Sequence, residues 1–194
     1  ANILIQCVLL LPTFQTNNLT VTLEKAREEV KRLYGNRLRI RVCGICIENN
    51  KILMLNHRGI GNTDTFWCPP GGGIDFEETT PAALKREFKE ETGLDVEIGS
   101  LMFVNEFIHP PLHALELFFE VKVIGGQQLL GSDPEMTTDT QIIQELRWMS
   151  FEDIKKYPSH EVHTLFKYCN RLSDIYLLKG YLNELNALTG VVHN

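Results

Sequence analysis

The feature that most constrains this chain is a glycine-rich turn followed by a short, strongly acidic segment. The turn ends at Gly73, the next segment opens with Thr80-Pro81, and Gly93 closes it. Threonine and proline are typical of a helix start, and glycine is typical of the position just after a helix. The sequence therefore predicts one short helix next to a turn that a ligand can approach closely.

Three carboxylates share one face of this predicted helix. At 3.6 residues per turn, Glu87, Glu90 and Glu91 project within roughly 100° of one another. Like charges one turn apart cost an isolated helix roughly 0.2–0.5 kcal/mol per pair. The 23 residues from Gly72 to Leu94 hold six acidic and three basic side chains, which is half of the net charge of -6. Some partner must offset this charge.

Two partners fit this acidic face. A divalent cation such as Mg²⁺ takes carboxylate and carbonyl oxygens, and the neighbouring turn offers backbone oxygens. Alternatively, the face is solvated and forms ion pairs with Lys85 and Lys89. The acidic face by itself leaves both interpretations open.

The full spacing resembles the signature of the Nudix hydrolase family. That signature is Gly, five residues, Glu, seven residues, then Arg-Glu-apolar-x-Glu-Glu-x-Gly-apolar, and every specified position is met between Gly72 and Leu94. A chance match is on the order of one in ten million. The flanking segments 67–71 and 144–148 also look like segments common in the family.

The resemblance implies cleavage of a nucleoside diphosphate linked to another moiety, by an activated water with Mg²⁺ or Mn²⁺. It assigns the metal to Glu87, Glu90 and Glu91, with the backbone oxygen of Gly72 or its neighbour completing the shell. The general base is either a glutamate of the helix, Glu87, or a glutamate of a later loop, Glu135.

The resemblance also implies structural roles within the signature. Glu78 and Arg86 would fix the geometry of the loop and helix, with Arg86 donating to the acidic side chains, and Gly93 would end the helix. The position before the first signature glutamate is often glycine in the family, whereas this chain has Glu77. That departure bears on the shape of the loop.

Several residues are candidates for binding the substrate. Arg58 and His57 precede the glycine-rich turn and are placed to approach a phosphate. Trp67, like Phe66 and Phe107, is a candidate for stacking on a base. Pro110 lies sixteen residues beyond the signature, where ADP-ribose and nucleotide-sugar cleavers of the family often have proline. ADP-ribose or a nucleotide sugar is the expected substrate; a nucleoside triphosphate, or ligand sensing without catalysis, is the alternative.

The resemblance and the element pattern predict an α/β fold, an α/β/α sandwich around a mixed sheet. Residues 37–157 form the expected core. Residues 1–36 form an apolar arm and an amphipathic helix at 22–34, available for packing or for a homodimer. Residues 158–194 form a C-terminal extension, with one or two helices expected from 161 to about 184.

Composition narrows the functional classes. The chain is 43% hydrophobic and 23% charged, an ordinary globular balance. Its acidity argues against nucleic acid as a partner, and no apolar run reaches the ~18–20 residues of a membrane span. Five scattered cysteines, including Cys43 and Cys46 in a predicted strand, do not suggest disulfides or a metal site. A cytoplasmic protein acting on a small nucleotide is the expectation.

Overall fold

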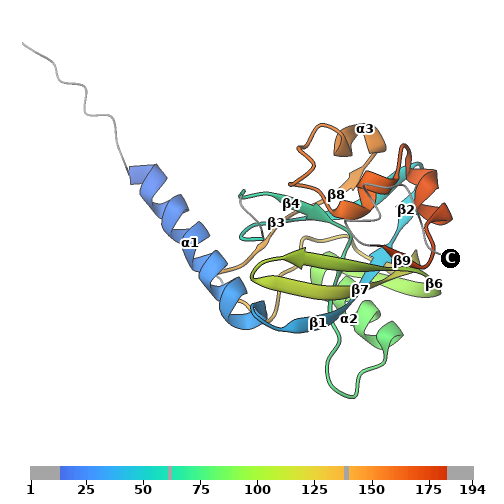
Figure 1. The fold of residues 1–194 in the computed structure, drawn as a ribbon, viewed down its shortest axis with the longest axis horizontal. Coiled ribbons are helices and arrows are strands. Elements are labelled where there is room, and N and C mark those ends of the chain that lie inside the picture. Colours follow the sequence, from blue (N-terminus) through green and yellow to red (C-terminus); the bar gives the residue numbers. More distant parts are fainter. Residues whose placement is uncertain (1–13, 61–62, 138–139, 183–194) are drawn as a thin grey trace, which may run out of the picture.

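The structure, a computed structural model, describes residues 14–60, 63–137 and 140–182, with side chains from residue 23 onward (Figure 1). Its elements are α1 (Phe14–Tyr34), β1 (Leu38–Ile45), β2 (Ile47–Glu48), β3 (Lys51–His57), β4 (Phe66–Cys68), β5 (Gly71–Gly73), α2 (Thr80–Thr92), β6 (Leu94–His109), β7 (Leu112–Gly126), β8 (Ile143–Met149), α3 (Phe151–Ile154) and β9 (Tyr181–Leu182). Two short 3-10 helices, Thr164–Tyr168 and Leu172–Leu177, lie between α3 and β9.

The strands form two sheets, one of them mixed. The larger sheet has the order β5-β1-β7-β6-β9, with β1–β7 and β6–β9 parallel and the other pairs antiparallel. In the second sheet, β3 pairs antiparallel with β2, β4 and β8. The predicted mixed α/β architecture is confirmed.

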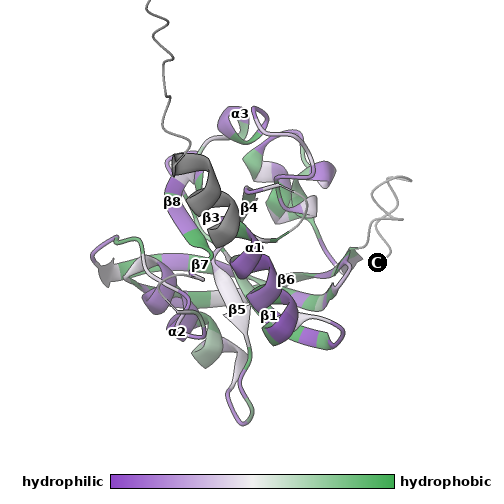
Figure 2. Ribbon diagram, turned by 90° about the vertical axis from the view of Figure 1, so that its left-hand side faces the viewer, coloured by the Kyte–Doolittle hydropathy of each residue, from purple (hydrophilic) through white to green (hydrophobic). Residues whose placement is uncertain are grey.

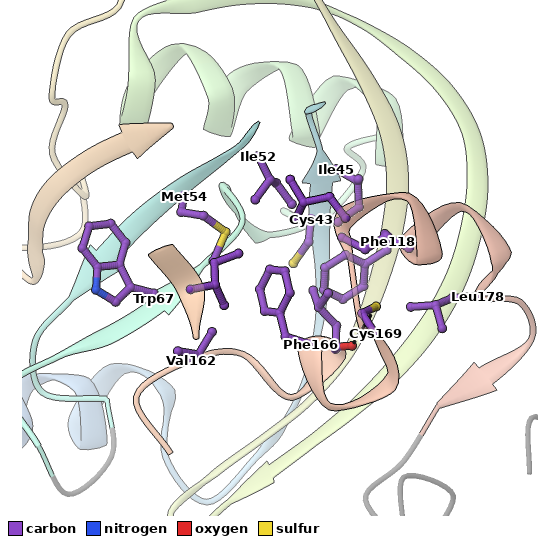
Figure 3. Packing of buried hydrophobic residues seen from close by; sticks show 14 of the residues in the cluster. Cys43, Ile45, Ile52, Met54, Trp67, Phe118, Val162, Phe166, Cys169 and Leu178 are labelled. Carbon is purple, nitrogen blue, oxygen red and sulfur yellow. Dashed lines mark hydrogen bonds between the residues drawn. The ribbon is translucent and has the colours of Figure 1, made fainter. Parts of the chain in front are cut away.

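Strand β1 shows how the layers are built. Side chains alternate across a strand, so Val42 faces α2 and packs with Leu84 and Phe88. Cys43 and Ile45 face the opposite side, where they pack with the C-terminal segment, as Figure 3 shows for Phe166 and Cys169. The sheet thus lies between a layer that contains α2 and a layer that contains the 3-10 helices.

Helix α1 packs through a narrow apolar stripe. Ala26, Val30 and Tyr34 are buried against Leu55 and Ile142. Figure 2 colours the described part of α1 largely as hydrophilic, and in Figure 1 its N-terminal half extends away from the sheets. The predicted amphipathic helix at 22–34 is confirmed and begins earlier, at Phe14. The apolar arm lies outside the described residues, and the homodimer stays a prediction.

The residue types at the turns explain their backbone conformations. Asn49-Asn50 between two apolar runs predicts a hairpin, and their φ values of 49° and 57° in the turn between β2 and β3 confirm it. Gly93 has φ 72° and its N–H bonds Lys89 O, which ends α2 as predicted. The N-cap is Thr79, one residue before the predicted Thr80.

The C-terminal segment differs from the prediction of one or two regular helices over 161–184. The two 3-10 helices there are short because the chain becomes extended at Cys169 and at Leu178, whose N–H groups bond Phe166 O and Ile175 O. Gly180, at φ 71°, then turns the chain into β9 beside β6. Residues 183 and 184 lie outside the described part.

The described helices include none that is long and apolar enough to cross a membrane.

Candidate active site

Helix α2 directs two buried carboxylates at the glycine-rich turn. Leu84 and Phe88 anchor α2 on the sheet, so the next face carries Glu87 and Glu91, which are 9% and 5% exposed. Glu91 Oε2 accepts a hydrogen bond of 2.9 Å from the Gly71 N–H. At Gly72, a Cβ would lie 2.2 Å from Glu87 Oε1. The absence of a side chain at Gly72 creates the space that the Glu87 carboxylate occupies.

Arg86 ties the acidic face to the loop before the helix. Its Nε and a terminal nitrogen bond the two oxygens of Glu78 at 3.0 and 2.9 Å, a bidentate pair. Its other terminal nitrogen bonds Glu87 Oε1 at 2.9 Å and Glu90 Oε2 at 3.2 Å, and a further bond reaches Gly73 O. Arg86 therefore bonds both Glu78 and the acidic side chains of α2, as the resemblance implies.

One guanidinium does not balance the buried charge of the helix. Burial raises the pKa of Glu87 to about 7, and the neighbouring charge of Glu91 adds to the rise, although Arg86 and Arg41 oppose it. A cation close to such a carboxylate would stabilise its ionised form. The electrostatics of the site favour an additional positive charge.

The donor set fits a hard divalent cation. Carboxylates of Glu87, Glu90 and Glu91 and a backbone oxygen of the turn are the oxygen ligands that Mg²⁺ and Mn²⁺ take, and Glu87 already occupies the hollow at Gly72. Within the described residues, no three His, Cys, Asp or Glu side chains converge closely enough to form a complete metal site. To bind a metal ion, Glu87 and Glu90 would therefore have to release their hydrogen bonds with Arg86.

A histidine and a cysteine lie behind Glu91. His57 is 4% exposed; its Nε2 lies 3.9 Å from Glu91 Oε1, and its Nδ1 lies 3.5 Å from Cys68 Sγ. Both His57 and its neighbour Arg58 were predicted to approach a phosphate. The structure instead places the Arg58 guanidinium 3.4 Å from Asp64 of the same loop, in an ion pair.

Trp67 is not available for stacking. It is 1% exposed and packs in the core cluster shown in Figure 3, with Tyr157 beside it. The prediction that Trp67 binds the substrate is wrong for this structure, because the strand pairing of β4 turns its side chain inward. Phe66 and Phe107 do line a pocket.

Two other predicted residues lie apart from the acidic face. Pro110 is in the tight turn between β6 and β7 and lines a groove against α1 with Arg27 and Val30. Glu135 lies in the loop before β8, where it lines an open groove with Arg39, Tyr34 and the turn residues. The role of Glu135 as the general base stays a prediction.

A pocket opens beside the glycine-rich turn. Its cavity volume is about 40 Å³, which is well below the ~300–1,000 Å³ of typical ligand sites. Its lining is Arg39, Arg41, Cys43, Ile60, Phe66, Cys68, Pro69, Phe107, Leu112, His113, Ala114, Glu116, Phe118 and His163. Arg41 connects it to the turn, since a terminal nitrogen of Arg41 bonds Gly71 O at 2.7 Å.

Three polar residues of this pocket, Arg41, Glu116 and His163, were not predicted as site residues. A signal for Glu116 was present, because it alternates with Ala114 and Phe118 and so lies on the inward face of a strand. His163 carried no signal, since it reaches the pocket from the C-terminal segment through the parallel bridge between Trp67 and Val162.

Known proteins resemble this chain in sequence and fold. A model of the NUDIX domain matches residues 37–167, about two thirds of the chain. An ADP-ribose pyrophosphatase of Methanocaldococcus jannaschii is 35% identical over 96 residues, which cover 48% of this chain and 56% of that protein. An 8-oxo-dGTP diphosphatase of Proteus vulgaris is 32% identical over 85 residues, which cover 44% of this chain and 76% of that protein.

A solved structure shares the fold. The MutT NUDIX hydrolase from Burkholderia pseudomallei superposes with a TM-score of 0.53 at 21% identity, covering 66% of this chain and 92% of that one. The chain spans little more than half the length of the Methanocaldococcus protein. The matched region extends ten residues past the predicted core boundary at 157, and that boundary stays a prediction.

Proposed function

The chain belongs to the Nudix family, and from this premise we propose that it hydrolyses the pyrophosphate bond of a nucleoside diphosphate linked to another moiety. ADP-ribose or a nucleotide sugar is the proposed substrate, giving a nucleoside monophosphate and a sugar phosphate. The observation that carries the proposal is the pair of buried carboxylates, Glu87 and Glu91, held against Gly72 and Gly71. Its support in the comparisons is the resemblance to an ADP-ribose pyrophosphatase.

The proposed cofactor is Mg²⁺ or Mn²⁺, held by Glu87, Glu90, Glu91 and a backbone oxygen at Gly71 or Gly72. When bound, such an ion offsets the charge of the diphosphate and lowers the pKa of water. The chain without it would present an acidic face to an anionic substrate. A cation between the carboxylates of α2 and the diphosphate would remove this repulsion.

Other residues of the site would orient the carboxylates and accept a proton. The Gly71 N–H fixes the orientation of Glu91, and Arg86 holds Glu87 and Glu90 on the same side of α2. Glu135 or Glu87 would take the proton from the attacking water as general base. Glu135 lies in a loop that Leu129 and Gly131 tie to the end of α2 through bonds to Thr92 O and Glu91 O.

A second candidate is cleavage of a nucleoside triphosphate to a monophosphate and pyrophosphate. It is favoured by the resemblance to an 8-oxo-dGTP diphosphatase, of which a larger share, 76%, is covered. A ligand sensor without activity is disfavoured because every signature residue is present.

A substrate panel distinguishes these functions. ADP-ribose, a nucleotide sugar and the nucleoside triphosphates are incubated with the full chain and Mg²⁺, and monophosphate release is followed by chromatography. The proposal predicts monophosphate and sugar phosphate from the first two compounds. Intact ADP-ribose and nucleotide sugar beside cleaved triphosphates would establish the second candidate instead.

A further inference from the structure

Helix α1 holds the loop that carries Glu135, although α1 lies outside the region that the NUDIX model matches, residues 37–167. Tyr34, the last residue of α1, donates its hydroxyl hydrogen to Asp133 Oδ2 at 3.1 Å, across 99 positions of the chain. Tyr34 is 7% exposed, and a buried hydroxyl is costly unless it is hydrogen-bonded. Phenylalanine would fill the same space, so the contribution of the hydroxyl is its bond to the loop.

Asp133 connects this hydroxyl to the backbone of Glu135. The Glu135 N–H donates to Asp133 Oδ1 at 2.9 Å, so the two oxygens of one carboxylate bond Tyr34 and Glu135. The backbone of Asp133 is held as well, because its N–H donates to Gln141 Oε1 at 2.9 Å and its carbonyl oxygen accepts from Gln141 Nε2 at 3.2 Å. Tyr34 and Glu135 are therefore joined through a single side chain whose own backbone is fixed.

An apolar contact docks the same loop on α1. Met136, which follows Glu135, is 8% exposed and packs in one cluster with Val30 and Tyr34. Glu135 itself is exposed. Packing thus accounts for Met136, whereas the hydrogen bonds through Asp133 determine where the backbone of the preceding residue, Glu135, lies.

Tyr34 also lies close to the glycine-rich turn, through Arg39 of β1. The guanidinium carbon of Arg39 is 3.9 Å from the centroid of the Tyr34 ring. A Cβ on Gly73 would lie 3.4 Å from a terminal nitrogen of Arg39. These three residues line one open groove together with Glu135. The groove therefore brings the loop to the end of the turn that contacts the carboxylates of α2.

The surroundings of Tyr34 keep its hydroxyl protonated. Burial raises the pKa of Tyr34, and the negative charges of Asp133 and Glu135 add to the rise, so the phenol remains a hydrogen-bond donor. Two backbone bonds of 2.9 Å tie the other end of the loop to the last turn of α2. The loop is therefore attached to both helices, and Tyr34 supplies the polar attachment next to Glu135.

We propose that Tyr34 is a positioning residue for the reaction, because through Asp133 it holds Glu135 beside the glycine-rich turn. This inference rests on the proposed function and takes Glu135, rather than Glu87, as the general base. A general base must lie within hydrogen-bond reach of the water that it deprotonates. Displacement of a reacting group by about an ångström costs up to ~10²-fold in rate. The Tyr34 hydroxyl limits such displacement of the loop, so α1 contributes to the active site from outside the matched region.

The test is a double-mutant cycle in the full chain. Tyr34→Phe keeps the ring that packs with Met136 and Arg39 and removes only the hydroxyl. We expect kcat to fall about tenfold, because the base is displaced, while KM stays within about twofold, because the contacts that bind the substrate are unchanged. In the Glu135→Gln background the same substitution should change kcat by less than about twofold, since the group that Tyr34 positions is already gone. Steady-state kinetics with Mg²⁺ measure all four proteins.

Two variants of Asp133 test the connection itself. Asp133→Ala removes both bonds and should lower kcat at least as much as Tyr34→Phe. Asp133→Asn can retain both, because the amide oxygen accepts from the Glu135 N–H and the amide NH₂ donates to the Tyr34 hydroxyl oxygen, so its kcat should return to within about threefold of the wild type.

Tyr176→Phe is the matched control, because Tyr176 is 44% exposed in the second 3-10 helix, and it should keep the wild-type kcat. Hydrogen exchange followed by NMR provides a readout independent of activity: exchange of the Glu135 amide should be at least about threefold faster in Tyr34→Phe and unchanged in Tyr176→Phe. A thermal melt verifies that each variant is folded.

Three results would overturn the inference: a wild-type kcat in Tyr34→Phe or in Glu135→Gln, an equal fall caused by Tyr34→Phe in both backgrounds, or an Asp133→Asn variant as impaired as Asp133→Ala. These results are separable from the proposed function. Cleavage of ADP-ribose with independent effects of Tyr34 and Glu135 refutes only the positioning role. If ADP-ribose and nucleotide sugars stay intact while a triphosphate is cleaved, the proposed substrate is refuted, and the cycle measured on the triphosphate still decides the role of Tyr34.

Discussion

Two groups of buried carboxylates in this protein have opposite electrostatic surroundings. On α2, burial and the charge of Glu91 raise the pKa of Glu87 to about 7. On β7, burial also favours the neutral form of Glu116, but contacts with His163, Arg41 and Asn105 outweigh it and hold the pKa of Glu116 below its usual range. In the first group the negative charge exceeds the positive charge that Arg86 supplies, as expected of a cation site. The second has its charge compensated by neighbouring groups within the protein.

The largest effect is expected from removing one charge of the α2 group. Glu91→Gln keeps the shape of the side chain and removes a proposed metal ligand, so turnover of ADP-ribose should fall at least ~10²-fold. Steady-state kinetics measure the fall. Glu97→Gln is the control that should keep full activity, because Glu97 is exposed on β6. If Glu91→Gln cleaved ADP-ribose as fast as the wild type, the α2 group would not be a cation site that the reaction needs.

A second substitution tests the hollow at the turn. In Gly72→Ala, the new Cβ would lie 2.2 Å from Glu87 Oε1, so the carboxylate must move. Displacement of a reacting group by about an ångström costs up to ~10²-fold in rate, and a loss of 10- to 100-fold is expected. Gly125→Ala is matched, because its Cβ would meet ordinary contacts of 3.7 Å. Equal activity of the two variants would contradict the account of Gly72.

Arg86 tests how the α2 group is held together before any ion binds. Arg86→Lys loses the bidentate bond to Glu78 and cannot reach Glu87, Glu90 and Gly73 O at the same time. The free energy of unfolding should fall by about 1–2 kcal/mol and activity by roughly tenfold. Urea unfolding and kinetics measure both quantities, and Lys85→Arg on the outer face of α2 serves as the control. Unchanged stability would mean that the contacts of Arg86 are incidental.

The smallest effect concerns acid stability and the β7 group. Because the pKa of Glu116 is lowered on folding, its ionised form stabilises the native state above the ordinary value of about 4.5. That contribution is lost as the pH falls through the lower, folded pKa. Urea unfolding between pH 6 and 3 should show stability falling more steeply in the wild type than in Glu116→Gln. Parallel curves would show that Glu116 is not held ionised by its neighbours.

The two groups also differ in how far the sequence predicted them. The α2 group is local: its residues lie within one turn and one helix, so the spacing that places Glu87 and Glu91 on one face is visible in the sequence. Helix α2, its end at Gly93 and the hairpin at Asn49-Asn50 were predicted for the same reason, since each depends on neighbouring residues.

The β7 group, by contrast, joins residues far apart in the chain. Arg41, Asn105, Glu116 and His163 come together only through strand pairing across β1, β7 and β6 and through the C-terminal segment. The same cause explains Trp67, whose burial depends on the pairing of β4 with β3 and on contacts with the C-terminal segment. The regular helices expected over 161–184 are absent because the backbone becomes extended at Cys169 and Leu178, although the apolar residues continue at helical spacing.

The most direct test of the central claim is a calorimetric titration of Mn²⁺ into the wild type and Glu91→Gln, each with and without α,β-methylene ADP. The account predicts saturable binding by the wild type that tightens with the nucleotide, and affinity at least about tenfold weaker in Glu91→Gln. A wild type that takes up no ion under either condition, or a variant that binds it equally well, would contradict the claim that α2 holds a cation for a diphosphate.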